Sequence, residues 1–475
     1  MRTNGLRLRS TTTILAAALV VAATPFGAAG ADSQRPIDAE QLGLGVFDNV
    51  AATLDVLVER SAAETSLALS RARFADGGAR YAVLARDDVF ADAMTASGLT
   101  QQGPLLLVPV GATLGDPAAV ADNLSELMLE LARVLPVGAP VYIIGGPGAI
   151  PDTVDALVGI AALGDVQRLA GSGRIETSIV VGTAVVVLRN GGSHEDIVAA
   201  AEAVMDAILA GNVEEVLGEI LSGAVGGVPL DLPDAPVDPD AIDCSDIANE
   251  PDPLCVDVTD PLPLRQLAQD AGDVNGPIED VVDGVTGAQA PSLKAGDVGI
   301  ARAFGPGGDP VATASWADSI SAGPWAAGVQ APIVLTDTES LHPLVGVFLT
   351  LTQPDRTIVL GGAAAVGDAA YEAVPGTKQR VGGADRVATA AAIDDQLIEG
   401  TGGPVLVIDG RDPAAWAYGL TAAGNVAASG GSILYADDGT IRGATSTARC
   451  DGRADVATIG ATSLIDVVAA ALSSC

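Results

Sequence analysis

The chain has 475 residues, of which 24 are basic and 60 acidic, and its formal net charge is -36. Because proteins bind nucleic acids by neutralising phosphates with Lys and Arg, this charge argues against an extended nucleic-acid groove. Residues of the hydrophobic class make up 49% of the chain but aromatic residues only 3%. Its cores must therefore consist of small aliphatic side chains, which favours α/β layers with closely packed helices.

The N-terminal segment, 1–31, is typical of a secretory signal peptide. Three arginines precede a short apolar run at residues 13–23, and Ala29-Gly30-Ala31 fits the small residues preferred at a cleavage site. The later sequence contains no run of about 18 apolar residues that could span a bilayer. We expect an exported protein without a membrane span, secreted or held at the cell wall or cell surface, in which residues 32–59 form a helical lead-in.

Three sequence features each occur three times, which indicates an internal repeat. An arginine opens a helix-like stretch at Arg60, Arg174 and Arg386. An aromatic residue followed by Ala opens a second helix at Phe90, Trp316 and Trp416, with an acid two positions later at Asp92 and Asp318. A β-branched run ends in a glycine turn before a helix at Gly145, Gly146, Gly361, Gly362 and Gly460.

The spacing of these features divides the chain into modules. The interval from Arg60 to Phe90 equals the interval from Arg386 to Trp416, whereas the interval from Arg174 to Trp316 is several times longer. The second copy therefore contains a long insertion relative to the other two. We expect module 1 at 60–173, module 2 at 174–385 with its insertion at about 190–300, and module 3 at 386–475.

Short apolar runs alternate with helix-like segments inside each module. In the first module such runs lie at 81–85, 104–110 and 141–146, in the second at 331–336 and 357–362, and in the third at 405–409, 432–436 and 456–460. Continuous apolar strands separated by helices predict mostly parallel sheets covered on both faces. With right-handed crossovers, the sequence predicts three tandem Rossmann-like modules of the α/β class.

The insertion has two parts of different composition. Residues 193–223 predict helix, with Ser193 and Asp196 forming a capping box. Residues 226–263 are rich in Pro and Asp and predict an irregular segment. Its acids lack the residue order of a calcium loop, so we favour a solvated linker and expect no metal site.

The four cysteines are expected to form disulfides in an exported chain. Three connectivities are possible, and we favour the local pairs because each lies within one segment. A buried free thiol is the alternative. The pairs are Cys244 with Cys255 and Cys450 with Cys475.

The sequence offers little for catalysis. Its two histidines are His194, at the expected start of a helix, and His342, before a proline, and neither H-E-x-x-H nor G-x-S-x-G occurs. The glycines at 145–148 lack dinucleotide-site spacing and fit a tight strand-to-helix turn. We expect no cofactor and no enzyme activity, although a pair of glycosidase carboxylates stays an alternative.

A twelve-residue stretch occurs twice, as QRLAGSGRIETS at 167–178 and QRVGGADRVATA at 379–390. Each copy carries two arginines at the same spacing, namely Arg168 and Arg174, then Arg380 and Arg386. They either pair with acids such as Glu176 or Asp385 and pin modules together, or bind phosphate or carboxylate groups of a polymer. The acidity of the chain favours the structural role.

Taken together, these motifs resemble the bacterial cell wall-binding repeat 2 family. The resemblance rests on the VYIIGG and TIVLGG strands, the two twelve-residue stretches, and the helix starts VFADAMTASG and SWADSISAG. It covers about residues 60–190 and 295–475 in three modules. Such a resemblance implies Rossmann-like modules around a pseudo-threefold axis, as in Gram-positive surface proteins that attach non-covalently to anionic cell-wall polymers.

The implied partner is thus a cell-wall polysaccharide or a teichoic-type polymer, and the repeated arginines would bind it or join modules. The chain departs from the family pattern where Tyr418 stands in place of Asp92 and Asp318. Ser61, Ile175 and Val387 also replace the junction tyrosine, and the acid before the arginine is kept only as Asp385. Two alternatives stay open: a hydrolase accessory, or a surface adhesin acting through the insertion.

Overall fold

The computed structural model describes residues 61–110, 117–221, 224–225, 228–229, 293, 295–309, 312–398, 404–437, 440–441, 443–445 and 456–458. Several sequence predictions lie outside these residues: the signal peptide, the lead-in, Arg60, Gly460, the four cysteines and nearly all of the segment 226–263.

The first sheet contains four parallel strands in the order β2-β1-β3-β4. They are β1 (Ala82–Arg86), β2 (Leu105–Val108), β3 (Val141–Ile144) and β4 (Val166–Leu169). The connecting helices are α2 (Ala62–Arg73), the 3-10 helix η2 (Ala93–Leu99), α3 (Pro117–Val134) and α4 (Asp152–Ala162). A capping box between Ser61 and Glu64 starts α2.

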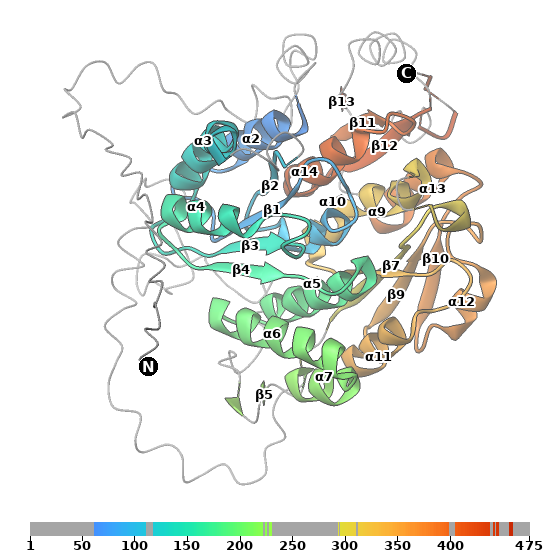
Figure 1. Ribbon diagram of the computed structural model, residues 1–475. Helices are drawn as coiled ribbons and strands as arrows, with labels where there is room; N and C mark the ends of the chain where they lie inside the picture. The colour runs from blue at the N-terminus through green and yellow to red at the C-terminus, as the bar shows by residue number, and fades with distance from the viewer. Residues whose placement is uncertain are drawn as a thin grey trace, which may run out of the picture. The chain divides into compact units, whose positions relative to one another are not determined.

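Both faces of this sheet are buried, as its continuous apolar strands predict. Successive side chains of a strand point to opposite faces. Ala82 and Leu84 belong to a core with α3 and α4, whereas Val83 and Ala85 belong to the core that includes α5 (Arg174–Arg189). In Figure 1, α4 and α5 lie on opposite sides of β3 and β4.

The second sheet repeats this topology, with parallel strands in the order β10-β9-β7-β8. They are β7 (Asp297–Arg302), β8 (Ile333–Thr336), β9 (Arg356–Leu360) and β10 (Lys378–Val381). Helix α5 packs against β8. The other helices are α9 (Ala317–Ser321), α10 (Gly323–Val329), α11 (Pro343–Thr352) and α12 (Asp368–Ala373), with the 3-10 turns η5 (Pro306–Gly308) and η6 (Thr313–Ser315).

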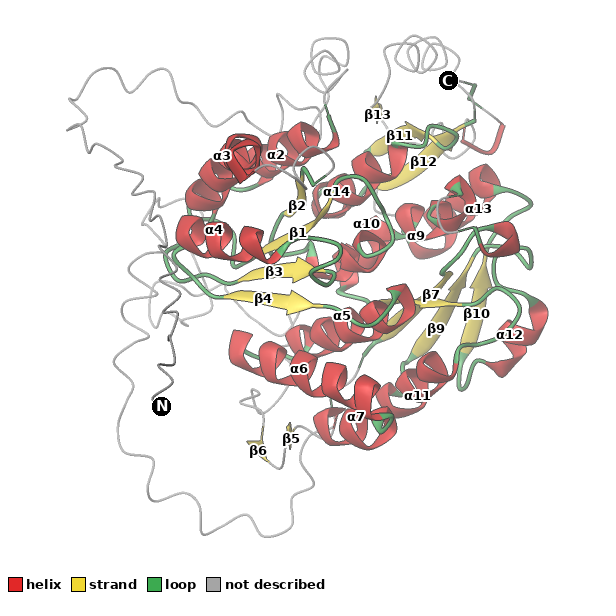
Figure 2. Ribbon diagram, viewed as in Figure 1, coloured by secondary structure: helices red, strands yellow, loops and turns green. Residues whose placement is uncertain are grey.

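The third sheet is described for three parallel strands in the order β12-β11-β13. These are β11 (Val405–Asp409), β12 (Ser432–Ala436) and β13 (Val456–Thr458), with the helices α13 (Arg386–Leu397) and α14 (Ala415–Ala428). Helices and parallel strands alternate along the chain (Figure 2). The predicted α/β class with Rossmann-like layers is confirmed, while the pseudo-threefold arrangement stays a prediction.

The sequence does not predict strands β4 and β10. It predicts the two twelve-residue stretches only as junctions between modules, whereas in the structure each stretch begins within a strand. Each strand lies at the edge of its sheet and buries fully only its last residue, Leu169 or Val381. Because an edge strand tolerates polar side chains, Gln and Arg interrupt the apolar run that identifies the inner strands.

The helical part of the insertion is integrated into the fold. It forms α6 (His194–Ala210) and α7 (Val213–Leu221), and the predicted capping box of Ser193 and Asp196 is confirmed. Gly211 ends α6 in the left-handed conformation, which divides the single helix that the sequence predicts. Ile197 and Val204 are buried in the same core as α5, and α7 packs against α11. Strands β5 (Ala224–Val225) and β6 (Val228–Pro229) form a short antiparallel pair beyond α7.

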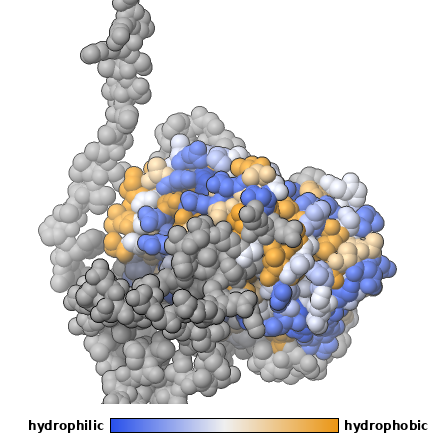
Figure 3. All heavy atoms as spheres, turned by 90° about the horizontal axis from the view of Figure 1, so that it is seen from below, coloured by the Kyte–Doolittle hydropathy of each residue, from blue (hydrophilic) through white to orange (hydrophobic). Residues whose placement is uncertain are grey.

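The described surface mixes polar and apolar residues. Figure 3 shows hydrophobic and hydrophilic residues side by side on one face. Several exposed large hydrophobic residues lie on or beside α3 and α4, namely Leu129, Val137, Ile160 and Leu163. Within the described residues, no helix is both long and apolar enough to cross a membrane.

Helices from the three sheets pack closely because small residues line their contacts. Helices η2, α10 and α14 contact one another pairwise. A Cβ added at Gly323 would lie 2.9 Å from Cβ of Ala423, and one added at Gly424 would clash with the carbonyl oxygen of Thr100. The Ala- and Gly-rich composition therefore sets the distance between these helices.

We predict that Gly424→Ala lowers the free energy of unfolding by about 1–3 kcal/mol, because the added methyl group overpacks the contact with Thr100. Gly218→Ala in α7 is the matched control, since the nearest atom to its added Cβ is 4.0 Å away. The control should raise the free energy of unfolding by about 0.5–1 kcal/mol through helix propensity. Urea unfolding measures both variants, and effects of the same sign and size would contradict the close packing.

Candidate functional site

The chain order of both four-stranded sheets creates a crevice at the carboxyl ends of their central strands. After β1 the chain passes to β2 on one side, and it later returns to β3 on the other side of β1. The connections that follow β1 and β3 therefore diverge, and this switch point is where open α/β sheets bind ligands. The second sheet has the same switch between β7 and β9.

The strand registers show which residues of the two crevices are equivalent. Leu84 pairs with Ile143 in the first sheet, and Ile300 pairs with Val359 in the second. Gly145 and Gly361 each lie two residues beyond the paired strand residue. Arg86 is therefore equivalent to Arg302, since both end their strands two residues after the pair.

A carboxylate presses against the glycine in each crevice. A Cβ added at Gly145 would lie 2.7 Å from Oδ2 of Asp92, and a Cβ at Gly361 would clash with the carboxylate of Asp318. Both glycines have positive φ, 106° and 92°, which L side chains rarely adopt. The predicted glycine turns thus serve a close approach of backbone and carboxylate.

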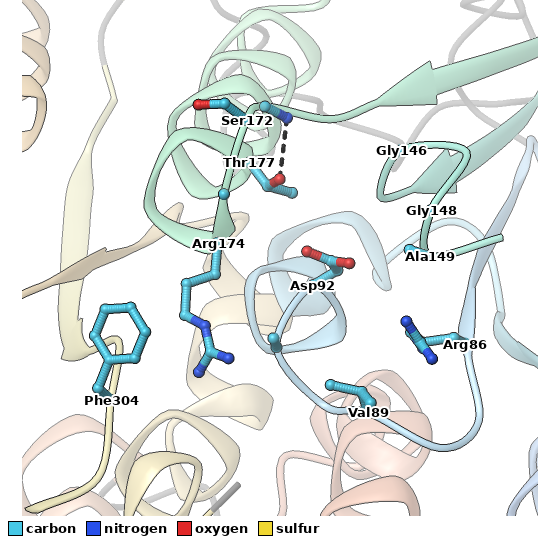
Figure 4. Close-up of a pocket in the computed structure, with 13 residues that line it drawn as sticks. Arg86, Val89, Asp92, Gly146, Gly148, Ala149, Ser172, Arg174, Thr177 and Phe304 are labelled. Atoms are coloured by element: carbon cyan, nitrogen blue, oxygen red, sulfur yellow. Dashed lines mark hydrogen bonds between the residues drawn. The ribbon is translucent and has the colours of Figure 1, made fainter. Parts of the chain in front are cut away.

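The first crevice opens into a cavity of about 570 Å³. Its lining comes from the segment after β1, the turn after β3, the start of α5 and the end of β7. Figure 4 shows Asp92 between Arg174 and Arg86, with Phe304 beyond Arg174. The lining residues are Arg86, Val89, Ala91, Asp92, Gly146, Gly148, Ala149, Gly171, Ser172, Gly173, Arg174, Thr177 and Phe304.

Asp92 supplies the negative charge of this cavity. Among the described residues, no group donates a hydrogen bond to its carboxylate. Burial raises the pKa of Asp92 above its ordinary value, while the charges of Arg86 and Arg174 oppose this rise. Its oxygens are therefore available to accept hydrogen bonds from a ligand.

The second arginine of each twelve-residue stretch joins two repeats. Arg174 donates a hydrogen bond of 2.7 Å to the carbonyl of Ala303, just after β7, and lies over the rings of Phe304 and Phe90 at 4.6 and 6.0 Å. Its equivalent Arg386 donates to the carbonyl of Gly410, just after β11. It also lies over the Trp316 ring at 6.0 Å. Each arginine thus connects its own sheet to the aromatic helix start of the preceding one.

The first arginine of each stretch holds the turn that precedes it. Arg168 donates to the carbonyls of Gly145 and Ile150 at 3.0 and 2.7 Å, and pairs with Asp155 at 2.6 Å. Arg380 likewise donates to the carbonyls of Gly361 and Val366 and lies 3.5 Å from Asp368.

These acid partners differ from the expected ones. Arg168 and Arg380 pair with acids on the helix after the glycine turn, whereas the sequence expectation names Glu176 and Asp385. Asp385 instead accepts a hydrogen bond from the backbone of Ala388 and starts α13. Sequence spacing cannot reveal these partners because the fold, not the chain, brings the helix back to the edge strand.

The third sheet carries different residues at the equivalent positions. Its register places Asp409 where Arg86 and Arg302 stand. Burial raises the pKa of Tyr418, which replaces the acid. Trp416 packs edge-on against Phe90 at 6.1 Å.

The two histidines take structural positions. His194 lies 3.0 Å from the hydroxyl of Tyr142, which links the insertion helix to β3, and burial lowers its pKa. His342 precedes α11 as its N-cap. No group of three His, Cys, Asp or Glu side chains suited to a metal ion occurs among the described residues.

The repeated motifs alone do not predict two of the lining residues, Arg86 and Phe304. A signal for Arg86 exists in the sequence, because VLAR and GIAR end equivalent strands with arginine. Phe304 comes from the second sheet, so its place in the first cavity depends on how the repeats pack.

Fold and crevice together define a class: an α/β protein of parallel sheets with a cavity at a switch point. Two segments, residues 60–155 and 294–371, match the family model of cell wall binding domain 2 (CWB2). The resemblance drawn from the repeated motifs is thereby confirmed for these segments. The matched family is one of binding domains, in agreement with the expectation of a binding protein rather than an enzyme.

Solved structures agree with the fold. Cwp8 from Clostridium difficile is similar with a TM-score of 0.53 and 17% identity, over 88% of this chain and 51% of that chain. Cwp6 from Clostridium difficile is similar with a TM-score of 0.54 and 16% identity, over 88% of this chain and 47% of that chain. The chain thus spans about half the length of these proteins. No curated protein matches the chain.

We predict that Arg168→Gln lowers the free energy of unfolding by about 2–4 kcal/mol, because it removes a half-buried ion pair and two bonds to carbonyls. Arg80→Gln is the control: it removes the same charge but only an exposed hydrogen bond to Gln102. The control should change the free energy of unfolding by less than about 0.5 kcal/mol. Equal effects in chemical denaturation would show that Arg168 does not hold the turn.

A second prediction concerns the buried carboxylate. Because the pKa of Asp92 is raised in the folded state, the folded chain binds this proton more tightly than the unfolded chain. As the pH rises above the ordinary pKa of 3.8, Asp92 loses its proton in the unfolded chain first, and the free energy of unfolding decreases. Asn does not titrate, so Asp92→Asn should gain stability relative to the wild type between about pH 3.5 and pH 7.

Thermal unfolding across this pH range measures the gain. Asp76→Asn removes one exposed acid near Arg133 and corrects for the change in net charge. Profiles of Asp92→Asn and the wild type that stay parallel would contradict the buried carboxylate.

Proposed function

We propose that this protein attaches non-covalently to an anionic cell-wall polymer, a polysaccharide or a teichoic-type polymer, as an exported surface protein. The observation that carries the proposal is the cavity at the first switch point, which combines the Arg174 guanidinium with the carboxylate of Asp92. It is lined from residues 86–92 and 146–149, which lie inside the first segment that matches the CWB2 model, and from Phe304, which lies inside the second.

The chemistry of the cavity suits a charged sugar polymer. The Arg174 guanidinium can share its donors with a phosphate or carboxylate. The Asp92 carboxylate accepts hydrogen bonds from hydroxyl groups, and the Phe304 ring offers an apolar face. The net charge of the chain is -36 and repels polyanions over most of the surface. The positive charge in the cavity can still attract an anionic group, because charges act mainly over short distances at physiological salt.

The repeated Arg168 and Arg380 have a different role in this proposal. Their guanidinium groups donate to carbonyls of the glycine turns and pair with nearby acids, so they stabilise the turns that form part of each crevice. Arg174 is the arginine of its stretch that faces the cavity. Arg386 takes the junction role at the second crevice.

The test is sedimentation of the purified protein with isolated cell walls, before and after extraction of their anionic polymer. The wild type should sediment with intact walls at physiological salt and less with extracted walls. We predict that Arg174→Gln weakens binding about tenfold or more, because it removes a charge-assisted bond worth about 1.5–3 kcal/mol.

Arg80→Gln changes the net charge equally, away from the cavity, and should bind as the wild type does. Unfolding curves confirm that both variants are folded. A wild-type protein that stays in solution with intact walls would refute the proposed function. Equal binding of both variants would show that the cavity is not the polymer-binding site.

A further inference from the structure

The equivalent arginines Arg86 and Arg302 lie differently in their crevices. Arg86 is turned to Asp88, to which it donates two hydrogen bonds of 2.6 and 2.8 Å from Nε and Nη2. Arg302 is turned inward, with Nη2 4.0 Å from Oδ2 of Asp318. The same residue on the same strand position thus has two orientations within one chain.

The inward orientation carries Arg302 across its crevice. Its Nη1 donates a hydrogen bond of 3.3 Å to the carbonyl of Ala364, in the turn after β9. Counting from the paired glycines, Ala364 is equivalent to Gly148, which lines the open cavity of the first sheet. Arg302 therefore occupies in the second crevice the space that is open in the first.

In its inward orientation, the Arg302 guanidinium does not have a hydrogen-bond acceptor for every N–H group. The side chain of Arg302 is 12% exposed and that of Asp318 is 8% exposed. Nε of Arg302 is buried and has no hydrogen-bond partner among the described residues. Because an unsatisfied buried donor is costly, the attraction of the buried Asp318 carboxylate must hold the arginine there.

The sequence explains the two orientations. Arg86 is followed by Asp87 and Asp88, whereas Arg302 is followed by Ala303 and Phe304. The position two residues after the arginine thus carries an acid in the first sheet and an aromatic ring in the second. A bidentate carboxylate competes with the buried acid for the guanidinium, and Phe304 cannot.

We propose that Asp88 is a positioning residue: it holds the Arg86 guanidinium in a pair with itself and away from Asp92, which keeps Asp92 open to a ligand. The second crevice is closed by Arg302, so the first is the one that takes a polymer unit. That unit bonds Asp92 through sugar hydroxyls and presents an anionic group to Arg174. The identity of the ligand rests on the proposed function, whereas the position of Arg86 does not.

The proposal opposes a simple electrostatic expectation. If Asp88 only neutralised Arg86, its removal would free a positive charge and tighten the binding of an anionic polymer. If Asp88 holds Arg86 aside, its removal lets Arg86 pair with Asp92, and the binding weakens.

The test uses Asp88→Ala. Asp76→Ala is the control, because it removes an acid near Arg133 before the start of β1, at the end of the strand opposite to Asp88. In a crystal structure of Asp88→Ala, a guanidinium nitrogen of Arg86 should lie within about 4 Å of the Asp92 carboxylate, an ion-pair distance. In wall sedimentation, Asp88→Ala should bind about fivefold more weakly than Asp76→Ala, the change expected from a competing ion pair of about 1 kcal/mol.

The double variant Arg86→Ala, Asp88→Ala separates closure from other damage. With the closing side chain removed, it should bind walls more tightly than Asp88→Ala alone. Asp88→Ala crystals in which Arg86 stays away from Asp92, or binding at or above the control level, would overturn the proposal. If the wild type fails to bind walls while Arg86 moves onto Asp92, the proposed function fails and the positioning role of Asp88 stands.

Discussion

The contact between the Asp92 carboxylate and the backbone of Gly145 sets the geometry of the whole site. This contact brings the start of η2 against the end of β3. The position is restricted to glycine for two reasons: its φ is positive, and an added Cβ would lie only 2.7 Å from Oδ2 of Asp92. Because partial burial disfavours the charged form of this carboxylate, nearby positive charge stabilises it, and Arg86 and Arg174 supply that charge. Packing and electrostatics therefore meet at one residue, and the open cavity lies between these groups.

Two arginines recur at a fixed spacing because they have two structural roles: one holds the glycine turn and the other connects neighbouring sheets. The first arginine ties an edge strand to the glycine turn beside it, and the second ties the next sheet to an aromatic ring of the previous one. Most of their hydrogen bonds end on backbone carbonyls, which do not depend on side-chain identity. This explains how the pattern QR…R persists while neighbouring residues vary between the copies.

Most inner strands and the helices were predictable because continuous apolar runs and glycine turns are local signals. The inner strand β7 was not, since it begins inside the segment expected to be an insertion. The edge strands β4 and β10 were not, because Gln and Arg break the run at a position where only tertiary pairing defines a strand. The candidate site was predictable as far as Asp92, Arg174 and Gly146, which belong to repeated motifs. Phe304 and the orientation of Arg86 were not, because they depend on packing between repeats and on one bidentate pair.

The central claim is that the crevice of the first sheet, and not that of the second, binds the wall polymer. Hydrogen exchange of the wild-type protein with and without soluble polymer fragments tests it most directly. When polymer is present, we expect slower exchange at residues 87–92, 145–150 and 171–177, with the equivalent residues 361–366 and 383–389 of the second sheet little changed. Equal protection of both crevices, or protection confined to other segments, would contradict it.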